Sequence, residues 1–588
     1  MAAVERKSIS REIVAKVIFA VLAAFSILAV CTIIGYLLYA SIPAFRNVGF
    51  FRFIFGSEWS AKTEVFGIWR MIVGTFFLTA CATLLGGTLA IFTAIWLVFY
   101  CPKRVKRVYT QMIELLAGIP SIVYGLFGYK FLMPLLVSIF RPSNAGFGLL
   151  ACTLVLSVMI LPTITSIAKN SLESVPMHYY EGALALGCSK NQAIWKVLLP
   201  AARSGIISAV VLGIGRAVGE TMAVQMIVGN GSAYPFGAFV PFTTLTSNIV
   251  LNWGYAAPPE QAALIADGFV LLLFILMLNL CLMAVKKPRE GNKFFSRRLR
   301  EGGRNDALKS YKRTGSVQDV LWIISWITAV VVAFVLAFIV IFVFAKGFPH
   351  LSADFLFGKS GNAHTTLAPA FVSTIMLIGL ALSIALPLGV GAAIFLNEYA
   401  KKGSVFVKVI RLFVDTLAGI PSIIFGLFGM VFFVLGMNMG YSLWAGGITL
   451  ALIILPTVIR STEQSLSEVP DSMREASFAL GAGKLRTIFI VVLPQAIAGL
   501  ITSVILSIGR IVNESAALIF TVGSASTFIP LSFGDSAASF SVLVWKFMSN
   551  GLQVNEAYAT ASVLLIFVIV LNLLVALVER SFNGRKRI

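Results

Sequence analysis

The strongest constraint on this fold is a segment that occurs twice in the chain. Residues 116–128 have the sequence LAGIPSIVYGLFG, and residues 417–429 have LAGIPSIIFGLFG, so the copies differ by one Val/Ile and one Tyr/Phe exchange. The similarity continues downstream, where the Ile-Leu-Pro of residues 160–162 returns at 454–456. Chance does not produce a repeat of this length, so we expect two copies of one structural module.

The composition places both modules in a membrane. Of the 588 residues, 58% are hydrophobic and 12% are charged, which predicts an all-α polytopic membrane protein. We expect about twelve helices, six in each half, with the halves at residues 1–285 and 317–588. The apolar runs of the first half are 13–40, 71–100, 109–139, 147–168, 205–228 and 262–285.

The formal net charge of +21 invites a nucleic-acid partner, but the distribution of the basic residues argues against one. Basic residues gather after the second apolar run, at residues 103–107, and in the polar segment 286–316 between the halves. Lys and Arg mark the cytoplasmic side of membrane proteins. We therefore interpret 286–316 as a basic cytoplasmic linker and place both termini in the cytoplasm. Retention on that side explains the linker charge better than a specific lipid or nucleic-acid site.

Charged residues recur at membrane depth in both halves. Arg216 and Glu220 interrupt one apolar stretch, and Arg510 and Glu514 interrupt the corresponding stretch of the second half. Four unpaired charges there would cost on the order of 10 kcal/mol. An even number of helices gives both halves the same orientation, so a pseudo-twofold axis along the membrane normal would carry the pathway. We expect the four residues to line that pathway or to pair with each other.

The spacing of these charges suggests a mechanism. If each stretch is one helix, arginine and glutamate share a helical face at i and i+4 and neutralise each other when the pathway is empty. Two arginines from related helices suit bidentate binding of a tetrahedral oxyanion. The glutamates would accept a hydrogen bond from phosphate, which keeps a proton that sulfate lacks. The alternative is two intrahelical salt bridges without ligand contact.

A second motif with matched spacing lies between the fourth and fifth apolar runs of each half. The sequence EGALALG, from Glu181 to Gly187, precedes nine residues and then VLLP. Its counterpart is EASFALG, from Glu475 to Gly481, then nine residues and VVLP. We expect a short amphipathic helix that ends at a glycine in a left-handed turn, a shape that can dock into a groove on a partner. The alternative is an ordinary interfacial loop.

This motif resembles the signature of ABC importer permeases, which is Glu-Ala-Ala, three residues, Gly, nine residues and a hydrophobic-x-Leu-Pro. The first copy departs from it at Gly182 and the second at Ser477. In that family the loop is the coupling helix that the cytoplasmic ATPase holds. The resemblance implies that the glutamate and glycine of each copy belong to the ATPase-coupling surface.

A closer resemblance covers nearly the whole chain. The first half resembles the PstC-type permease of phosphate-specific ABC importers and the second half the PstA-type, here fused. The second half departs from the family at Asn513, where a glycine is usual. The asparagine either alters local packing or adds a polar ligand, so Asn513 is a candidate pathway residue. Arg460 is another, because an arginine near the cytoplasmic end of the fourth helix could receive the anion or act as an interfacial anchor. The resemblance rests on residues 116–128, 213–224, 244–246, 417–429 and 556–561.

The resemblance implies a type I ABC importer permease fold with two pseudo-symmetric six-helix halves, in the cell membrane of a bacterium or archaeon. It also implies a phosphate-binding protein outside the membrane and two copies of a cytoplasmic ATPase. We expect no catalytic residue, metal site or directly bound cofactor. ATP is used by the partner subunits, because the best Walker A candidate, Gly358-Lys-Ser360, has Ala353 where the first glycine is needed.

Other functions remain open from the sequence. A permease for sulfate or molybdate would share the fold and the oxyanion chemistry. A secondary anion transporter also uses repeats and midplane charges, but it would not need duplicated docking loops. A membrane signalling protein is a third class, although nothing in the sequence resembles a kinase or receiver module.

Overall fold

The computed structural model describes residues 2–286, 304–358, 366–401, 404–549, 551 and 553–585. Most of the expected linker, 286–316, lies outside these residues. Its last part, from Arg304, already belongs to a helix.

The first half is helical apart from one antiparallel hairpin, in which Trp59 pairs with Phe66. Several helices end in π-helical turns, labelled η1 to η3, and η4 is a 3₁₀ turn. Its elements are α1 (Ala2–Val48), α2 (Phe50–Phe55), β1 (Trp59–Ser60), β2 (Val65–Phe66), α3 (Trp69–Ile95), η1 (Trp96–Tyr100), α4 (Lys103–Ala117), α5 (Ser121–Phe127), η2 (Gly128–Leu132), α6 (Met133–Phe140), α7 (Leu149–Glu173), α8 (Met177–Ala185), α9 (Lys190–Ala193), η3 (Ile194–Leu198), α10 (Leu199–Ala201), α11 (Arg203–Val218), α12 (Met222–Ile227), α13 (Leu245–Asn252), η4 (Trp253–Tyr255) and α14 (Pro258–Lys286).

The second half repeats most of this order, although its described residues contain no strand. Its elements are α16 (Arg304–Gly347), η5 (Phe348–His350), α17 (Ala353–Phe357), α18 (Ala368–Ile394), η6 (Phe395–Tyr399), α19 (Val405–Gly419), α20 (Ser422–Gly429), η7 (Met430–Gly436), α21 (Leu443–Ser467), α22 (Asp471–Ala479), α23 (Lys484–Thr487), η8 (Ile488–Val492), α24 (Leu493–Asn513), α25 (Ala516–Thr521), α26 (Phe540–Ser549) and α27 (Val554–Arg585).

The number of membrane-spanning helices agrees with the sequence. Within the described residues, ten helices are long and apolar enough to cross a membrane, or twelve if each of two bent pairs forms one span. One pair, Lys190–Ala201 with Arg203–Val218, bends by 68°, and the other, Val405–Gly419 with Ser422–Gly436, bends by 94°. The expectation of an all-α polytopic protein with about twelve helices is confirmed.

The two halves pack in the same way, and each also contributes a helix to the other. Helix α3 lies along α7 as α18 lies along α21, and α1 packs on α14 as α16 packs on α27. In addition, α1 contacts α18 and α19 of the second half, while α16 contacts α3 of the first. This reciprocal exchange interlocks the halves, so the repeated modules do not form separate bundles.

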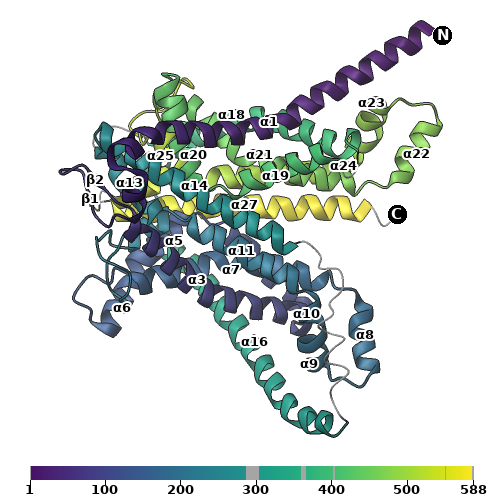
Figure 1. Cartoon of the computed structure of the whole chain (residues 1–588), viewed down its shortest axis with the longest axis horizontal. Helices are drawn as coiled ribbons and strands as arrows, with labels where there is room; N and C mark the ends of the chain where they lie inside the picture. The colour runs from purple at the N-terminus through teal and green to yellow at the C-terminus, as the bar shows by residue number, and fades with distance from the viewer. Residues whose placement is uncertain are drawn as a thin grey trace.

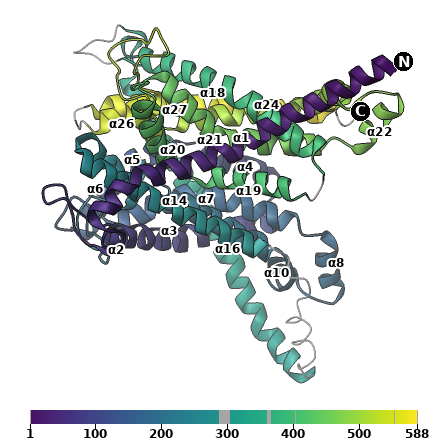
Figure 2. The same ribbon diagram turned by 45° about the horizontal axis from the view of Figure 1, so that its top comes forward.

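Both chain ends lie at the same end of the molecule as α8 and α22 (Figures 1 and 2). The β1–β2 hairpin, α6 and α13 lie at the opposite end (Figure 1). The two motifs that resemble coupling helices therefore occupy one end of the bundle, together with the termini.

The sequence predicted that each apolar stretch carrying the paired charges forms one continuous helix. In the structure, neither stretch does. The stretch 204–229 divides into α11, which ends at Val218, and α12, which begins at Met222. The stretch 498–523 divides into α24 and α25, with Glu514 between them. The expectation that Arg and Glu share one face of a continuous helix is therefore wrong.

Hydrogen bonds from neighbouring segments stabilise these interruptions. The carbonyl oxygen of Glu220 accepts a hydrogen bond from Thr246 Oγ1 at 2.9 Å, and that of Glu514 accepts one from Ser541 Oγ. A break at membrane depth is tolerated when other protein groups bind the freed backbone atoms. The sequence of α11 or α24 alone does not contain these partners.

The third helix of each half also divides, at the repeated Gly-Ile-Pro. Helix α4 ends at Ala117 and α5 begins at Ser121, while α19 ends at Gly419 and α20 begins at Ser422. Proline cannot donate a backbone hydrogen bond and disfavours helical geometry at the residue before it, so the helix stops there. Pro120 and Pro421 therefore each mark a complete interruption of the third helix.

The close contact of α3 with α7 gives a test of the packing. A Cβ added at Gly86 would lie 2.7 Å from the carbonyl oxygen and 2.8 Å from the Cα of Ser157, whereas a Cβ at Gly379 would meet no heavy atom within 4 Å. Because Ser157 backbone atoms cannot move aside, Gly86→Ala should lower the free energy of unfolding by about 1–3 kcal/mol. Gly379→Ala should leave it unchanged or raise it. Equal thermal unfolding midpoints of the two purified variants would contradict this packing.

Candidate functional site

One cavity of about 630 Å³ lies between the two halves. Arg216 and Glu220 line it from the first half, and Arg510 and Glu514 line it from the second. The pathway residues predicted from the sequence thus lie around a common space, as the pseudo-twofold arrangement requires. Their role in binding a substrate stays a prediction.

Each arginine is held by a threonine of a neighbouring helix. Arg216 Nη1 donates a 2.6 Å hydrogen bond to Thr163 Oγ1 in α7, and Arg510 Nη1 donates a 2.9 Å hydrogen bond to Thr457 Oγ1 in α21. A guanidinium group has five N–H donors, and each of these bonds uses one. The threonines orient the two cations without neutralising them.

The glutamates do not form ion pairs with these arginines. Among the ion pairs of the described residues, none joins Arg216 to Glu220 or Arg510 to Glu514. The direct ion pair expected within each half is therefore not formed. The helix break that separates the arginine from the glutamate explains this, because it removes the i, i+4 geometry.

The carboxylates instead bind the first turn of the helix that follows each break. Glu220 Oε1 accepts a hydrogen bond from the amide of Ala223 at 3.4 Å, and Glu514 Oε1 accepts one from the amide of Ala517 at 3.1 Å. Acidic groups are favourable at a helix N-terminus, where backbone N–H groups lack partners. Each glutamate thus helps to hold a short outer helix, α12 or α25, while facing the cavity.

The two Gly-Ile-Pro breaks also line the cavity, and each packs against the opposite half. A Cβ on Gly118 would lie 2.9 Å from Val568 Cγ1 of α27, and a Cβ on Gly419 would lie 2.4 Å from Asn279 Nδ2 of α14. A side chain at either glycine would force Val568 or Asn279 to move. The repeated Gly-Ile-Pro segment therefore shapes the cavity wall as well as ending the helix.

The cavity lies on one side of the breaks. It follows α11, α14, α24 and α27 toward the end that carries α8 and α22, and its lining includes no residue of α12, α13, α25 or α26. On the other side the helices pack tightly, since a Cβ on Gly125 would lie 3.1 Å from the Cα of Ala223 and one on Gly426 2.8 Å from that of Ala517. Within each half, α5 or α20 therefore packs closely on the short helix that follows the break.

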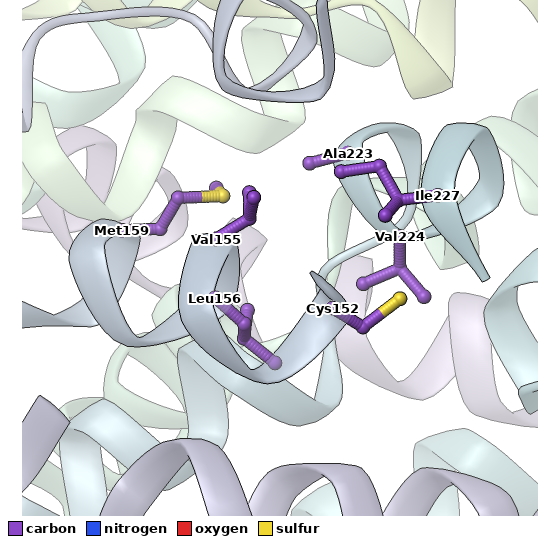
Figure 3. Close-up of a pocket in the computed structure, with 7 residues that line it drawn as sticks. All are labelled: Cys152, Val155, Leu156, Met159, Ala223, Val224 and Ile227. Carbon is purple, nitrogen blue, oxygen red and sulfur yellow. The ribbon is translucent and has the colours of Figure 1, made fainter. Parts of the chain in front are cut away.

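A small apolar pocket lies between α7 and α12, in the same tightly packed region (Figure 3). Cys152 and Val155 of α7 face Val224 and Ile227 of α12 across it, and it has no space for a water molecule. We interpret it as a packing contact that fixes α12, and with it Glu220, against α7.

Three asparagines complete the polar part of the wall. Asn513 donates a 2.6 Å hydrogen bond through Nδ2 to the carbonyl oxygen of Gly118 in the other half. Asn279 of α14 and Asn572 of α27 occupy matching places in the two halves, and both line the cavity. Asn572 Nδ2 donates to Val568 O of its own helix at 3.0 Å. The sequence predicted Asn513 as a pathway residue, because it stands where the resembled family usually has a glycine.

Sequence reasoning did not find four of these wall and positioning residues. Thr163 and Thr457 follow the repeated Ile-Leu-Pro directly, and Asn279 and Asn572 both stand in a repeated Leu-Asn-Leu. Polar residues that recur at the same place in two apolar helices were the available signal. The sequence alone could not show which way these side chains face.

The remaining candidate, Arg460, is not part of the cavity wall. It lies in α21 and forms an ion pair with Asp415 of α19, and both side chains are about half exposed. Glu114 holds the position in the first half that Asp415 holds in the second, and it lines the cavity. A role of Arg460 in anion release stays a prediction. Its ion pair with Asp415 is the kind of contact that an interfacial anchor makes.

The predicted docking motifs form two matching short helices. Glu181 lies in α8 and Glu475 in α22, and the following glycines, Gly187 and Gly481, have φ values of +82° and +81°. The expected glycine-terminated helix is therefore present twice, although it begins earlier than Glu181. In each copy the residue before the glycine is an exposed leucine, Leu186 at 88% and Leu480 at 89%.

Comparison with known proteins gives the family. The profile described as "Binding-protein-dependent transport system inner membrane component" matches residues 86–287 and again residues 385–588, which together exceed half of the chain. The chain belongs to this family. Apart from its last two residues, the first match falls within the expected first half, and the second match falls within the second half, so two inner membrane components are fused in one chain.

Individual relatives agree with the fusion of PstC- and PstA-like halves. The phosphate transport system permease protein PstA homolog of Mycoplasma pneumoniae is 27% identical over 89% of this chain and 88% of its own length. A probable ABC transporter permease protein of Bacillus subtilis, YqgH, is 44% identical over 36% of this chain and 71% of its length. The phosphate transport system permease protein PstC of Mesorhizobium japonicum is 35% identical over 39% of this chain and 76% of its length.

The threonine partners of the arginines can be tested by stability. Thr457→Val keeps the side-chain shape but leaves an Arg510 N–H without its acceptor, so the free energy of unfolding should fall by about 1–3 kcal/mol. Thr502→Val is the matched control, since Thr502 Oγ1 bonds only to Ala498 O of its own helix, and it should change stability by about 0.5 kcal/mol or less. Equal shifts in the thermal unfolding midpoint would show that the Thr457 contact does not hold Arg510.

Proposed function

We propose that this chain is the transmembrane permease of an ATP-driven phosphate importer and contains the whole translocation pathway. The observation that carries the proposal is the shared cavity, in which one arginine of each half faces the same space. The names of the relatives support phosphate as the substrate. The family match supports a permease that works with a separate binding protein.

The chemistry of the cavity suits an oxyanion. Arg216 and Arg510 are not paired with carboxylates, and most of their N–H donors remain for a ligand. Planar guanidinium groups bind phosphate oxygens in pairs, and two groups on opposite walls can bind one tetrahedral anion from both sides. Glu220 or Glu514 then accepts the hydrogen bond that the protonated oxygen of phosphate donates, whereas sulfate has no proton to donate. Phosphate is favoured over sulfate or molybdate on this basis.

The exposed ends of α8 and α22 supply the contact with ATPase subunits. Leu186 and Leu480 are exposed and directly follow α8 and α22. These two helices lie at the same end of the molecule as both termini (Figures 1 and 2). Isolated exposed leucines at matching positions suit two grooves on two copies of a partner. We place this end in the cytoplasm of a bacterial or archaeal cell, because basic residues gather there, and we place the phosphate-binding protein at the hairpin end.

ATP hydrolysis belongs to the partners in this proposal. The cavity lies on the side of the breaks that carries α8 and α22, so we expect the described state to release phosphate toward that end. ATP binding by the partner subunits would draw α8 and α22 together and open the other side. A secondary transporter would transport anion without these subunits, and dependence on a co-reconstituted ATPase distinguishes the two.

The pathway role can be tested by uptake into proteoliposomes with a phosphate-binding protein and an ATPase. Arg510→Lys keeps the charge but loses the bidentate geometry, so phosphate uptake should fall about tenfold or more. Glu220→Gln should also reduce uptake, because it removes a carboxylate that accepts from phosphate. Arg411→Lys is the control, since Arg411 pairs with Glu463 outside the cavity. Normal uptake by the Arg510 and Glu220 variants, with assembly verified, would exclude a ligand role.

The coupling surface can be tested separately. Leu480→Ser removes an apolar contact at the tip of α22, so ATPase association should weaken about tenfold or more, with a matching loss of phosphate-stimulated ATP hydrolysis. Leu531→Ser is the matched control, because Leu531 is also 92% exposed but follows α25 toward the hairpin end. Equal association by both variants, measured by pull-down and surface plasmon resonance, would contradict docking at α22.

A further inference from the structure

The first helix of each half, which packs on the other half, also reaches the end of the molecule that carries the docking helices α8 and α22. Helix α1 of the first half contacts α23 of the second half, and α16 of the second half contacts α9 of the first (Figure 1). Both α9 and α23 begin three residues after the glycine that follows a docking helix, Gly187 after α8 and Gly481 after α22. Each first helix therefore contacts the segment that follows the docking helix of the other half.

Acidic side chains at corresponding positions make these contacts. Glu12 Oε1 of α1 accepts a hydrogen bond from the backbone amide of Lys484 at 2.8 Å. Asp319 Oδ1 of α16 accepts a hydrogen bond from Asn191 Nδ2 at 3.0 Å. The long apolar spans of the two first helices begin at these two acidic residues. Glu12 and Asp319 thus lie at the same end of their helices, where each helix leaves the membrane span.

Aromatic contacts repeat the same register further along both helices. An aromatic residue follows each acidic residue by seven positions, Phe19 in α1 and Trp326 in α16. Phe19 lies against Tyr399 of η6, with ring centroids 5.8 Å apart. Trp326 lies against Trp96 of η1, with ring centroids 5.1 Å apart. Because η6 belongs to the second half and η1 to the first, each first helix is attached to the opposite half at two levels.

In the second half, the Glu12 contact replaces a local helix cap. At the start of α9, Ser189 Oγ accepts a hydrogen bond from the amide of Gln192 within its own half. The N-cap of α23 is Gly483, which has no side chain, and Glu12 binds the amide of Lys484 in its place. Free N–H groups at the start of a helix favour an acidic partner. The start of α23 therefore depends on a helix of the other half.

The attached helices lead to the cavity wall. Helix α1 packs on α14 and α16 packs on α27, and Leu278 of α14 and Leu571 of α27 line the cavity. On the docking side, α23 continues through η8 into α24, which carries Arg510. A displacement of α22 thus has two routes to the cavity. One follows α24 within its own half, and the other follows Glu12, α1 and α14 in the opposite half.

We propose that Glu12 and Asp319 are positioning residues of the transport cycle, which carry the movement of each docking helix to the cavity wall of the opposite half. The inference rests on the proposed function, in which ATPase subunits hold α8 and α22. When the ATPase moves α22, the segment bound to Glu12 displaces α1 and α14, so the walls of both halves move together. Without these contacts each ATPase subunit acts on one half alone, and fewer phosphate ions cross for each ATP hydrolysed.

The experiment measures phosphate uptake and ATP hydrolysis in the same proteoliposomes, which contain the full chain, the ATPase and the phosphate-binding protein. Glu12→Ala should lower the number of phosphate ions transported per ATP by about fivefold or more, a change typical of coupling between sites. ATPase association, measured by surface plasmon resonance, should stay unchanged because Leu186 and Leu480 are intact. Asp319→Ala should lower the ratio as well, through α16 and α27. Lys16→Gln is the matched control, since Lys16 is exposed one turn further along α1, and it should keep the wild-type ratio.

A second variant separates transmission from capping. The backbone of Gly483, with φ −69° and ψ 161°, matches that of Ser189, with φ −66° and ψ 160°. Glu12→Ala combined with Gly483→Ser therefore gives α23 a cap from its own half without the contact to α1. This double variant should keep the lowered ratio, and it carries the test should Glu12→Ala alone lower the thermal unfolding midpoint. Recovery of the wild-type ratio would show that Glu12 only caps α23, and it would overturn the inference.

The outcomes distinguish this inference from the proposed function. Wild type that takes up phosphate with ATP, while Glu12→Ala or Asp319→Ala keeps the wild-type ratio, would overturn the inference and leave the phosphate importer standing. Wild type without ATP-dependent phosphate uptake would overturn both.

Discussion

Two guanidinium groups at membrane depth need polar surroundings, and most of the inner architecture serves this need. Each arginine donates to a threonine on a neighbouring helix rather than to a carboxylate of its own segment. Each helix then ends within a few residues of its arginine, and the carboxylate that follows binds the next helix. Placing one such charge in hydrocarbon costs about 2.5–3.5 kcal/mol. Here each guanidinium group lies in a cavity, without a direct ion pair to a carboxylate.

The cavity exists because the two modules contact each other through their interruptions. The Gly-Ile-Pro break of each half packs on the last long helix of the other half, and the first helices α1 and α16 exchange partners. A motion of one half relative to the other must therefore change the cavity itself. This arrangement links the exposed helices α8 and α22, at one end, to the arginines in the middle of the molecule.

The sequence predicted the repeat, the membrane class, the two docking helices and the arginine-lined space, because each depends on local composition or on a motif present twice. It did not predict the breaks after Val218 and Asn513, since these depend on hydroxyls of Thr246 and Ser541, which lie far along the chain. It also missed Asn279, because an asparagine in an apolar run gives no information about the surface that it faces. The exchange of first helices between halves has no signal in either module alone.

The central claim is that Arg216 and Arg510 contact one substrate anion between the halves. A cryo-electron microscopy structure of the full chain in lipid nanodiscs, determined with and without saturating phosphate, tests this most directly. The account predicts new density between the two guanidinium groups, within hydrogen-bonding distance of both. Density elsewhere with this cavity empty, or arginines turned away from a common space, would contradict it.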